Sequence, residues 1–433
     1  MPRTVIIGAG SHFGARLSTD ILAHPELREG AIALVDIDPE HLRCAEAYVR
    51  KVVELHGAPV TVEASTDRRA LLEGADFVIV SVAVGGPAYS GVPYYREIAI
   101  PRRYGVSQQV GDTIGPGGLF RAFRTAPTML AICRDLEELC PRALVLNYTN
   151  PMAILCWAMT EATRARCVGL CHSVQHTSRQ LAEYIGKPFE ETSSQVAGIN
   201  HMAWFLEFRW RGEDAYPLLR AAMENPEVLA RDRVRFELFR HFDTFVTESS
   251  PHLSEYVPYF RKRPELLEPM GLQHRDPEER PAAAGHWRPG SRLRRQLEGL
   301  EPIDLAGSPE YASSIVQAVW TGAPARINAN VPNAGCITNL PAGCCVEVPC
   351  LVDAGGVQPC AVGALPPQLA ALNLSNVVSQ DLAVQAILEQ DARKAYHALL
   401  LDPLTAAVCA PWEIRAMFDD LAEAEAEWTP WLR

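Results

Sequence analysis

Two short segments of the sequence each place a potential metal ligand among small and apolar residues. Cys171 lies within residues 169–174, and His201 lies within residues 198–204. A cysteine thiolate and a histidine imidazole can together bind a divalent transition metal, and two protein ligands leave positions open for substrate oxygens or water. From the residues alone, the alternative stays open that Cys171 is a buried packing residue and His201 a structural histidine.

Two further segments concentrate polar side chains. Residues 248–259 combine two acids, a histidine and two tyrosines, of which Tyr256 is one. Such a mixture suits a substrate pocket, although a solvated loop with aromatic anchors would have the same composition. Residues 108–118, which contain Asp112, are too rich in glycine for a helix or a strand. A long loop inside a nucleotide-binding domain is more often functional than idle, so we expect this one to serve a site.

A glycine-rich turn near the N-terminus has the pattern G-x-G-x-x-x-G, which begins with Gly8 and Gly10 and includes Ser11. It follows a strand-like apolar run and opens the first helix, as a dinucleotide-binding loop must. The first glycine permits a tight turn, the second lets the backbone approach a pyrophosphate, and the helix N-terminus faces the phosphates. Asp36 ends the second apolar run and would accept from the ribose 2′-hydroxyl, which favours NAD over NADP. The alternative is a Rossmann-like domain that binds no nucleotide.

The elements that must position these residues alternate between short β-branched runs and helical patterns over the first 170 residues. We expect strands at residues 4–7, 31–35, 60–63, 77–82, 143–146 and 167–169. The alternation predicts an α/β fold in which a Rossmann-type parallel sheet carries helices on both faces. Asn150 lies just beyond the fifth run, at the carboxyl edge where open α/β sheets bind ligands.

The sequence changes character after about residue 171. We therefore expect an NAD-binding domain at residues 1–170 and a second, α+β domain for metal and substrate at residues 171–433. The patterns in the second part predict a helix at 177–185, a strand at 202–209 and one amphipathic helix at 377–400. Residues 273–300 are rich in proline, glycine, arginine and glutamate, and we expect a surface excursion or mobile loop there.

The composition narrows the classes of partner. The 433 residues are 48% hydrophobic and 21% charged, which excludes global disorder, and the formal net charge of −12 disfavours nucleic acid and anionic membranes. No apolar run reaches the roughly 18–20 residues needed to cross a bilayer, and the N-terminus lacks a signal-peptide pattern. The 12 cysteines include no C-x-x-C pair. We expect a cytoplasmic protein with free thiols and with neither nucleic acid nor membrane as partner.

Several of these segments, taken together and in order, resemble glycoside hydrolase family 4. The matching segments are residues 8–11, 111–113, 115–118, 147–151, 171–174, 198–201, 254–256 and 330–349. The resemblance spans nearly the whole chain, and it implies a fold similar to that of lactate and malate dehydrogenases, with a second lobe that closes the site. It also implies NAD and a divalent metal, typically Mn²⁺, as cofactors, a small carbohydrate as substrate, and a homodimer or homotetramer.

The resemblance assigns a role to individual residues. Cys171 and His201 would bind the metal, Tyr256 would remove the proton at sugar C2 as a base, and His172 would protonate the leaving group. The residues that would bind sugar hydroxyls are Asn150 and Asp112, and those that would bind NAD are Gly8, Gly10, Ser11 and Asp36. NAD would take a hydride from C3 and return it after elimination and water addition at C1, so that no net redox change occurs. The alternative for His172 is to orient Cys171 or the water, because the phospho-enzymes of the family carry a carboxylate there.

The residues after Cys171 bear on the sugar. Family members that act on 6-phosphorylated sugars usually carry Asp or Asn next and Pro two places further, whereas this chain has His172 and Val174. The pattern resembles the unphosphorylated α-glycosidase branch, and the α-galactosidases in particular. An α-galacturonidase, with a cation such as Arg261 or a neighbouring basic residue facing the substrate carboxylate, and an α-glucosidase are the alternatives. Outside the family, the alternative is a 2-hydroxy-acid dehydrogenase, but the Asp/His pair and arginine of that class are not found.

Overall fold

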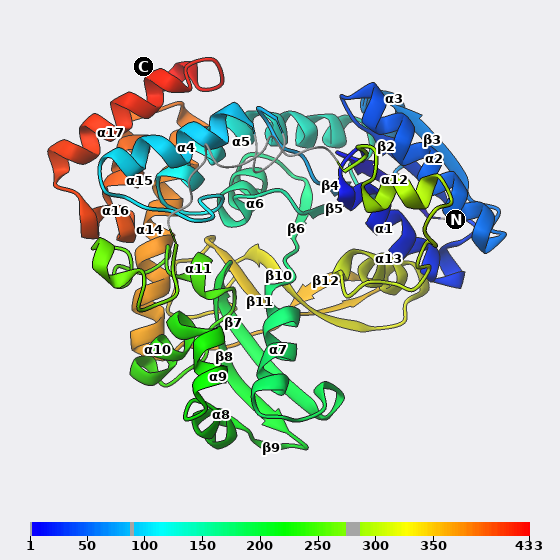
Figure 1. The fold of residues 1–433 in the computed structure, drawn as a ribbon. Helices are drawn as coiled ribbons and strands as arrows, with labels where there is room; N and C mark the ends of the chain where they lie inside the picture. The colour runs from blue at the N-terminus through cyan, green and yellow to red at the C-terminus, as the bar shows by residue number, and fades with distance from the viewer. Residues whose placement is uncertain (1, 87–90, 274–285) are drawn as a thin grey trace.

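One sheet organises the computed structural model, which describes residues 2–86, 91–273 and 286–433. The sheet has twelve strands in the order β3-β2-β1-β4-β5-β6-β10-β11-β7-β8-β9, with β12 paired to β11 (Figure 1). A parallel half comes first in the sequence and an antiparallel half follows it. The two halves meet where β6 pairs with β10.

The parallel half consists of β1 (Arg3–Ile7), β2 (Ala31–Val35), β3 (Thr61–Ser65), β4 (Phe77–Val80), β5 (Leu144–Asn147) and β6 (Arg166–Gly169). These are the six strands expected from the sequence, with ends that differ by one or two residues at most. Strands buried on both faces read as continuous apolar runs, which is why the sequence located them so well. The predicted α/β fold with a Rossmann-type parallel sheet is confirmed.

Helices cover the sheet and complete the molecule. Their bounds are α1 (His12–Ala23), α2 (Pro39–His56), α3 (Arg69–Leu72), α4 (Val92–Arg103), α5 (Gly115–Leu139), α6 (Met152–Ala162), α7 (Ser173–Tyr184), α8 (Tyr216–Ala222), α9 (Pro226–Arg231), α10 (Arg233–Phe242), α11 (Ser250–Leu253), α12 (Arg292–Leu297), α13 (Tyr311–Thr321), α14 (Pro367–Glu389), α15 (Ala392–Leu400), α16 (Pro403–Val408) and α17 (Pro411–Ala424). Single 3-10 turns lie at Pro25–Leu27, Phe189–Glu191, Pro264–Leu266 and Pro430–Leu432. Across the described ranges, no helix combines the length and the apolar character needed to cross a bilayer.

The antiparallel half consists of β7 (Thr192–Ile199), β8 (Met202–Trp210), β9 (Glu213–Asp214), β10 (Ala325–Pro332), β11 (Cys345–Asp353) and β12 (Gly356–Pro359). One row of paired residues crosses four of the strands at the join: Gly169 of β6 pairs with Asn330 of β10, Asn330 with Glu347 of β11, and Glu347 with Gly198 of β7. The predicted second part of α+β character is confirmed. The division into domains at residues 170 and 171 stays a prediction, because the sheet continues across it.

The amphipathic helix predicted at residues 377–400 is wrong in one respect. The structure has two helices there, α14 and α15, which pack against each other. Gln390 takes a left-handed conformation (φ 55°), and the Asp391 carboxylate accepts from the backbone N–H groups of Arg393 and Lys394 to cap α15. An aspartate at this position is a standard N-cap, so the break was readable in the sequence.

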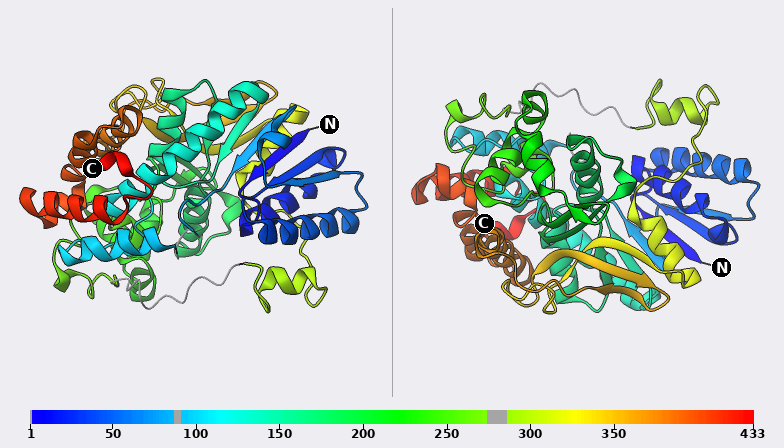
Figure 2. Two further views of the ribbon diagram at one scale, coloured as in Figure 1. Left: turned by 90° about the horizontal axis from the view of Figure 1, so that it is seen from above. Right: turned by 90° about the horizontal axis from the view of Figure 1, so that it is seen from below.

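The excursion predicted at residues 273–300 is ordered in its second half, and residues 274–285 lie outside the described part of the chain. Trp287 donates from Nε1 to the carbonyl of Gly10 at 2.8 Å, and Lys51 on α2 donates to the carbonyl of Gln296 at 2.9 Å. The helix α12 accordingly lies against the N-terminal helices drawn in blue (Figure 2). The indole of Trp287 anchors this segment on the glycine loop, although the segment shows no hydrophobic periodicity.

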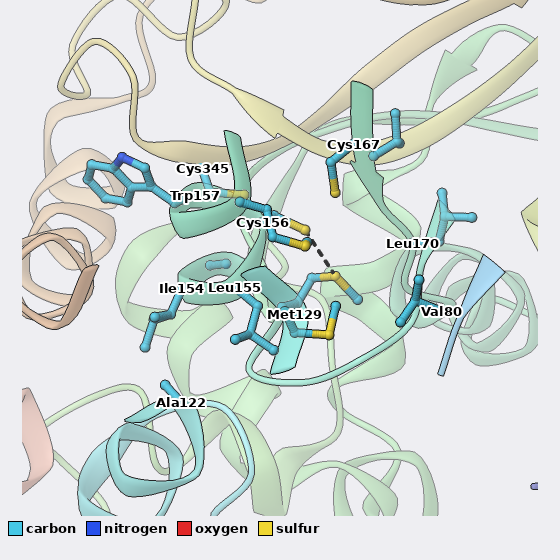
Figure 3. Close-up of a cluster of buried hydrophobic side chains, with 14 of the residues drawn as sticks. Val80, Ala122, Met129, Ile154, Leu155, Cys156, Trp157, Cys167, Leu170 and Cys345 are labelled. Carbon is cyan, nitrogen blue, oxygen red and sulfur yellow. Dashed lines mark hydrogen bonds between the residues drawn. The ribbon is translucent and has the colours of Figure 1, made fainter. Parts of the chain in front are cut away.

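A sulfur-rich core lies beneath the join of the two halves. Cys156 of α6, Cys167 of β6 and Cys345 of β11 approach one another there, together with Met129 of α5 (Figure 3). All three thiols are buried, and all twelve cysteines are free, as expected from the sequence. Gly169 completes this packing, because a Cβ on it would lie 2.7 Å from Cys156 Sγ and 2.9 Å from Asn330 Cβ.

Replacing Gly169 with alanine should destabilise the protein, because an added methyl group has no room in this close-packed core. Overpacking of this kind costs about 1–3 kcal/mol. We expect a lower urea midpoint with an unchanged slope of the unfolding free energy. Gly307→Ala is the matched control, since a Cβ there meets its nearest atom, Ala23 Cβ, at 3.7 Å. Equal midpoints for Gly169→Ala and the wild type would contradict this account of the join.

Candidate active site at the carboxyl ends of the parallel strands

The glycine loop after β1 is held in shape by its own hydrogen bonds. The backbone N–H groups of Gly8 and Ala9 both donate to the carbonyl of Val35, at 2.8 and 3.0 Å, and Ser11 Oγ donates to the carbonyl of Gly8 at 2.8 Å. Gly8 has φ 89°, a conformation that favours glycine. The loop therefore presents a preformed turn at the start of α1, as the sequence pattern predicted.

Asp36 ties the end of β2 to the same loop. Its Oδ2 accepts from the Gly10 backbone N–H at 2.7 Å, and its Oδ1 accepts from the Asp38 N–H at 2.9 Å. A Cβ on Gly10 would lie 2.7 Å from Asp36 Oδ2, so glycine is needed for this approach. The structure thus places Gly8, Gly10, Ser11 and Asp36 together, and their role in binding a dinucleotide stays a prediction.

Cys171, His201 and Glu248 converge on one point. One potential ligand atom from each, a sulfur, a nitrogen and an oxygen, lies within 4.8 Å of the other two. The distance between His201 Nε2 and Glu248 Oε2 is 3.8 Å. The structure therefore brings together the two predicted ligands, Cys171 and His201, and adds an acid that the sequence analysis did not single out. A thiolate, an imidazole and a carboxylate form a donor set that fits a divalent transition metal.

Neighbouring backbone pairings fix these three residues. Cys171 follows the end of β6, where Leu170 donates its N–H to the carbonyl of Asn147 at 2.9 Å. His201 occupies the turn between β7 and β8. Thr247 pairs with Ala203 at the start of β8, through its own N–H at 2.8 Å and through Oγ1 at 3.0 Å. The residue before Glu248 is therefore hydrogen-bonded to a residue two positions after His201, which holds the two side chains near each other.

The charge environment of this cluster is strongly negative. Burial raises the pKa of the Cys171 thiol well above its usual range, and the carboxylates of Glu347 and Glu248 raise it further. Burial also raises the pKa of Glu347 to about 7, against the opposing effect of His201. Both Glu347 carboxylate oxygens are fully buried, and the neutral side-chain amide of Asn200 approaches them. A bound cation would favour the thiolate and would compensate these buried acids.

Tyr256 lies beside the cluster and belongs to a chain of hydrogen bonds. Its hydroxyl donates to Thr113 Oγ1 at 2.7 Å, and Thr113 Oγ1 lies 2.8 Å from His252 Nε2. The Tyr256 and His201 ring centroids are 6.3 Å apart. Burial raises the pKa of Tyr256 well above its usual range, and the carboxylates of Asp112 and Glu248 add to this rise. A role as base therefore depends on positive charge arriving nearby.

Asp112 and Asn150 adjoin the same network. Asn150 Nδ2 donates to Asp112 Oδ2 at 2.8 Å, and Asp112 Oδ1 lies 3.3 Å from His252 Nε2. The two predicted substrate-binding residues are thus direct partners of each other. Asn150 precedes a cis peptide bond to Pro151, and it remains half-buried.

His172 takes a different position. Its side chain is 62% exposed, and Nδ1 lies 3.7 Å from a carboxylate oxygen of Glu310. No hydrogen bond joins its side chain to Cys171, His201 or Tyr256 in the described residues. Its role as an acid stays a prediction.

Glu255 is a further residue that the sequence analysis did not assign. It is fully buried, and Oε1 accepts from the backbone N–H groups of Gln109 and Val110 at 2.6 and 2.8 Å. Oε2 accepts from the Gly111 N–H at 3.0 Å. One carboxylate thereby shapes the loop that carries Asp112. The prediction of a loop over residues 108–118 is wrong at its end, because residues 115–118 form the first turn of α5. The sequence feature that could have pointed to Glu255 is its position directly before Tyr256, but its partners are visible only in the fold.

Arg261, proposed above as a cation for a substrate carboxylate, serves the same loop. Its Nε donates to Ser254 Oγ at 2.6 Å, and its terminal nitrogens donate to Ser107 O and Gln109 Oε1, each at 3.2 Å. The guanidinium is buried at 2% exposure. The structure therefore gives Arg261 a loop-holding function, whereas Lys262 and Arg263 are exposed.

Replacing Glu255 with glutamine should loosen the loop, because an amide NH₂ would face backbone donors that now have a carboxylate. Leaving buried donors unpaired costs about 1–3 kcal/mol. We expect faster hydrogen–deuterium exchange at residues 109–111 and a lower melting temperature. Glu265→Gln is the control, because Glu265 is exposed and pairs with Arg263. Unchanged exchange at residues 109–111 would refute this role of Glu255.

Comparison with known proteins agrees with this arrangement. The chain is 38% identical over 435 residues to an α-galactosidase of Bacillus subtilis, covering 99% of both proteins. It is 30% identical to an α-galacturonidase of Thermoanaerobacterium saccharolyticum, covering 92% of this chain and 90% of the relative. It is 28% identical to an α-glucosidase of Erwinia rhapontici, covering 100% and 99%.

Solved structures show the same fold. A 6-phospho-α-glucosidase from gut microorganisms, in complex with NAD and Mn²⁺, has a TM-score of 0.82 at 20% identity and covers all of both chains. Malate dehydrogenase from Plasmodium falciparum in complex with NADH has a TM-score of 0.53 at 13% identity, covering 90% of this chain and 99% of that one. The family description "Family 4 glycosyl hydrolase" matches residues 3–187, and that of its C-terminal domain matches residues 196–405. The chain therefore belongs to glycosyl hydrolase family 4.

Proposed function

We propose that this chain hydrolyses α-galactosides of unphosphorylated sugars, with NAD and a divalent metal such as Mn²⁺ as cofactors. The observation that carries the proposal is the convergence of Cys171 and His201 beside Tyr256, in a chain 38% identical to an α-galactosidase. The donor set fits the metal, and the loop at Gly8 and Gly10 fits a dinucleotide. Mn²⁺ and NAD occupy a structural neighbour of the same fold, which supports both choices.

The topology supports a shared site for the two cofactors. The glycine loop follows β1, Asn150 follows β5, and Cys171 follows β6, while β4 lies between β1 and β5. The carboxyl ends of parallel strands meet at one edge of a sheet, so all three groups face the same side. A sugar bound there would lie between the dinucleotide and the metal.

Each residue has a defined task in the proposed reaction. When bound, NAD would accept and later return the hydride of sugar C3, and the metal would polarise the oxygens at C2 and C3. Cys171 and His201 would hold the metal. Tyr256 would take the C2 proton, which becomes acidic once C3 is oxidised. The group at C1 would then leave with a proton from His172, and water would add at C1.

Asn150 and Asp112 would hold sugar hydroxyls, since an amide and a carboxylate supply the donor and acceptor groups that hydroxyls need. Gly8, Gly10, Ser11 and Asp36 would hold NAD. The Asp36 carboxylate would repel a 2′-phosphate, which favours NAD over NADP. The chain as a whole would work in the cytoplasm as a homodimer or homotetramer.

The preference for galactosides over galacturonides rests on charge. A substrate carboxylate would need a cation in the pocket, and Arg261 already donates to neutral acceptors on its own segment, Pro251 and Ser254, and on the glycine-rich loop, Ser107 and Gln109. His172 and Val174 also depart from the residues usual in the phospho-sugar enzymes of the family. These two departures speak against a 6-phosphorylated sugar. Within the same mechanism, α-galacturonidase and α-glucosidase activities remain the alternatives.

A panel of nitrophenyl glycosides should identify the substrate. With NAD, Mn²⁺ and thiol present, we expect the α-galactoside to be cleaved faster than the α-glucoside, the α-galacturonide and any 6-phosphorylated analogue. Hydrolysis should produce no net NADH, because the hydride returns to the sugar. Accumulation of NADH with substrate would instead indicate a dehydrogenase. Faster cleavage of the galacturonide would overturn the sugar assignment.

The Tyr256→Phe variant should lose activity by about 10²–10⁴-fold, the usual contribution of a positioned general base. It should also lose the exchange of deuterium from solvent into C2 of the product. Tyr259→Phe is the matched control, because Tyr259 is 39% exposed and packs on Phe242. A Tyr256→Phe enzyme with full activity and full C2 exchange would refute the role of Tyr256 as base.

A further inference from the structure

We propose that Glu248 is a third protein ligand of the metal, alongside Cys171 and His201. This inference rests on the proposed function, because it supplies a ligand to the metal site assigned there. The family resemblance implies two ligands, and the Glu248 carboxylate enters from a separate segment of the chain between α10 and α11.

The geometry of the three side chains matches a shared ion. Ligand atoms that lie about 2.0–2.3 Å from one metal are at most roughly 4.6 Å apart. The three candidate atoms are within 4.8 Å of one another, so side-chain movements of a few tenths of an ångström would close the site. The nitrogen of His201 that faces Glu248 is Nε2, while Nδ1 lies 3.5 Å from Thr113 Oγ1. His201 can therefore offer Nε2 to a metal while the other ring nitrogen is held.

Glu248 divides its two oxygens in the same way. Oε2 lies 3.8 Å from His201 Nε2, and Oε1 lies 3.7 Å from Nδ1 of His252. His252 in turn lies 3.3 Å from Asp112. Oε2 thus faces the position where a metal would lie between Cys171, His201 and Glu248, while Oε1 faces His252. This is the arrangement in which a carboxylate ligand is held by an outer partner.

The backbone conformation at Glu248 helps to place its carboxylate. Glu248 has φ 73°, a left-handed conformation that residues with a side chain rarely adopt. Immediately before it, Thr247 is fixed by two hydrogen bonds to Ala203, two residues after His201. Strained residues of this kind persist where the surrounding structure holds them, and they cluster at ligand sites. The turn carries the carboxylate toward His201 rather than into solvent.

Charge provides an independent reason for a cation at this point. Glu347 is fully buried next to the cluster. The group that approaches its carboxylate is the side-chain amide of Asn200, 1% exposed and adjacent to His201, and this amide carries no charge that could neutralise the acid. Buried carboxylates are paired or coordinate metals, because isolated burial is costly. A divalent ion on Cys171, His201 and Glu248 would neutralise the thiolate and the Glu248 carboxylate.

The test is the affinity of the NAD-free protein for Mn²⁺ alone, measured by the electron paramagnetic resonance signal of free Mn²⁺. We expect one tight site in the wild type, and affinity more than about 100-fold lower in Glu248→Gln, because replacing a residue that only supports a ligand typically costs roughly 10- to 100-fold. Glu237→Gln is the matched control, because Glu237 is a partly exposed acid on α10 that pairs with Arg240 and His241. It should bind Mn²⁺ like the wild type.

Two further variants separate this inference from the proposed function. Cys171→Ser and His201→Ala should also lose Mn²⁺ affinity. If they do and Glu248→Gln loses about 100-fold or less, Glu248 is at most a supporting partner of His201 and His252, and the present inference is overturned while the proposed function stands. If the wild type itself binds no Mn²⁺, both are overturned.

Folding is monitored in parallel. Glu248→Asp keeps the charge but withdraws the carboxylate by one methylene, and we expect it to remain folded in the absence of metal and still to bind Mn²⁺ more weakly than the wild type. Wild-type affinity in Glu248→Asp together with wild-type affinity in Glu248→Gln would refute the assignment. A melting temperature that rises with Mn²⁺ in the wild type, and rises less in both Glu248 variants, would support it.

Discussion

The site depends on one row of backbone pairs that joins the parallel and antiparallel halves of the sheet. Gly169, Asn330, Glu347 and Gly198 stand side by side across β6, β10, β11 and β7. Cys171 lies two residues beyond one end of the row, and His201 lies three residues beyond the other. Both ends are glycine because a Cβ at either would lie within 2.6–2.7 Å of neighbouring atoms. The separation of the two predicted metal ligands is therefore set by strand pairing and not by flexible loops.

The middle of the same row explains the electrostatics. Glu347 and Asn330 are fully buried between the two glycines. Asn330 Oδ1 has no partner among the described residues, and the Glu347 carboxylate is approached by the uncharged amide of Asn200. A fold would not keep such groups unless something compensates them, since an unpaired buried carboxylate is far more costly than an apolar residue of similar size. His201 lies close enough to oppose the raised pKa of Glu347. The strands that position the ligands thus also create a negative environment that favours a cation.

Much of this could be predicted from the sequence, for physical reasons that differ between residues. Strands such as Val5–Ile7 and Phe77–Val80 are readable because both faces are buried and the apolar run is continuous. The glycine loop and Asp36 are readable because their roles are local in sequence. The cluster of Cys171 and His201 came from a family resemblance, since nothing in the spacing of residues 171 and 201 shows that β10 and β11 lie between β6 and β7.

The residues that sequence reasoning missed act across long separations. Glu255 accepts from backbone amides nearly 150 positions away, and Trp287 donates to the carbonyl of Gly10, near the N-terminus. Glu248 was visible as an acid in a polar segment, but its conformation and its distance to His201 are properties of the fold. The break at Gln390 is the exception, because Asp391 carried a local capping signal that the apolar periodicity outweighed.

The parallel half and the antiparallel half both contribute to the candidate site. A parallel sheet with a glycine loop after its first strand is what a dinucleotide requires. A thiol after β6, an imidazole between β7 and β8 and a carboxylate between α10 and α11 converge beside that sheet. A hydride acceptor alone can only oxidise a sugar. With a metal and a buried tyrosine beside it, oxidation at one carbon can acidify the next, and the glycosidic bond can break without any lasting change in redox state.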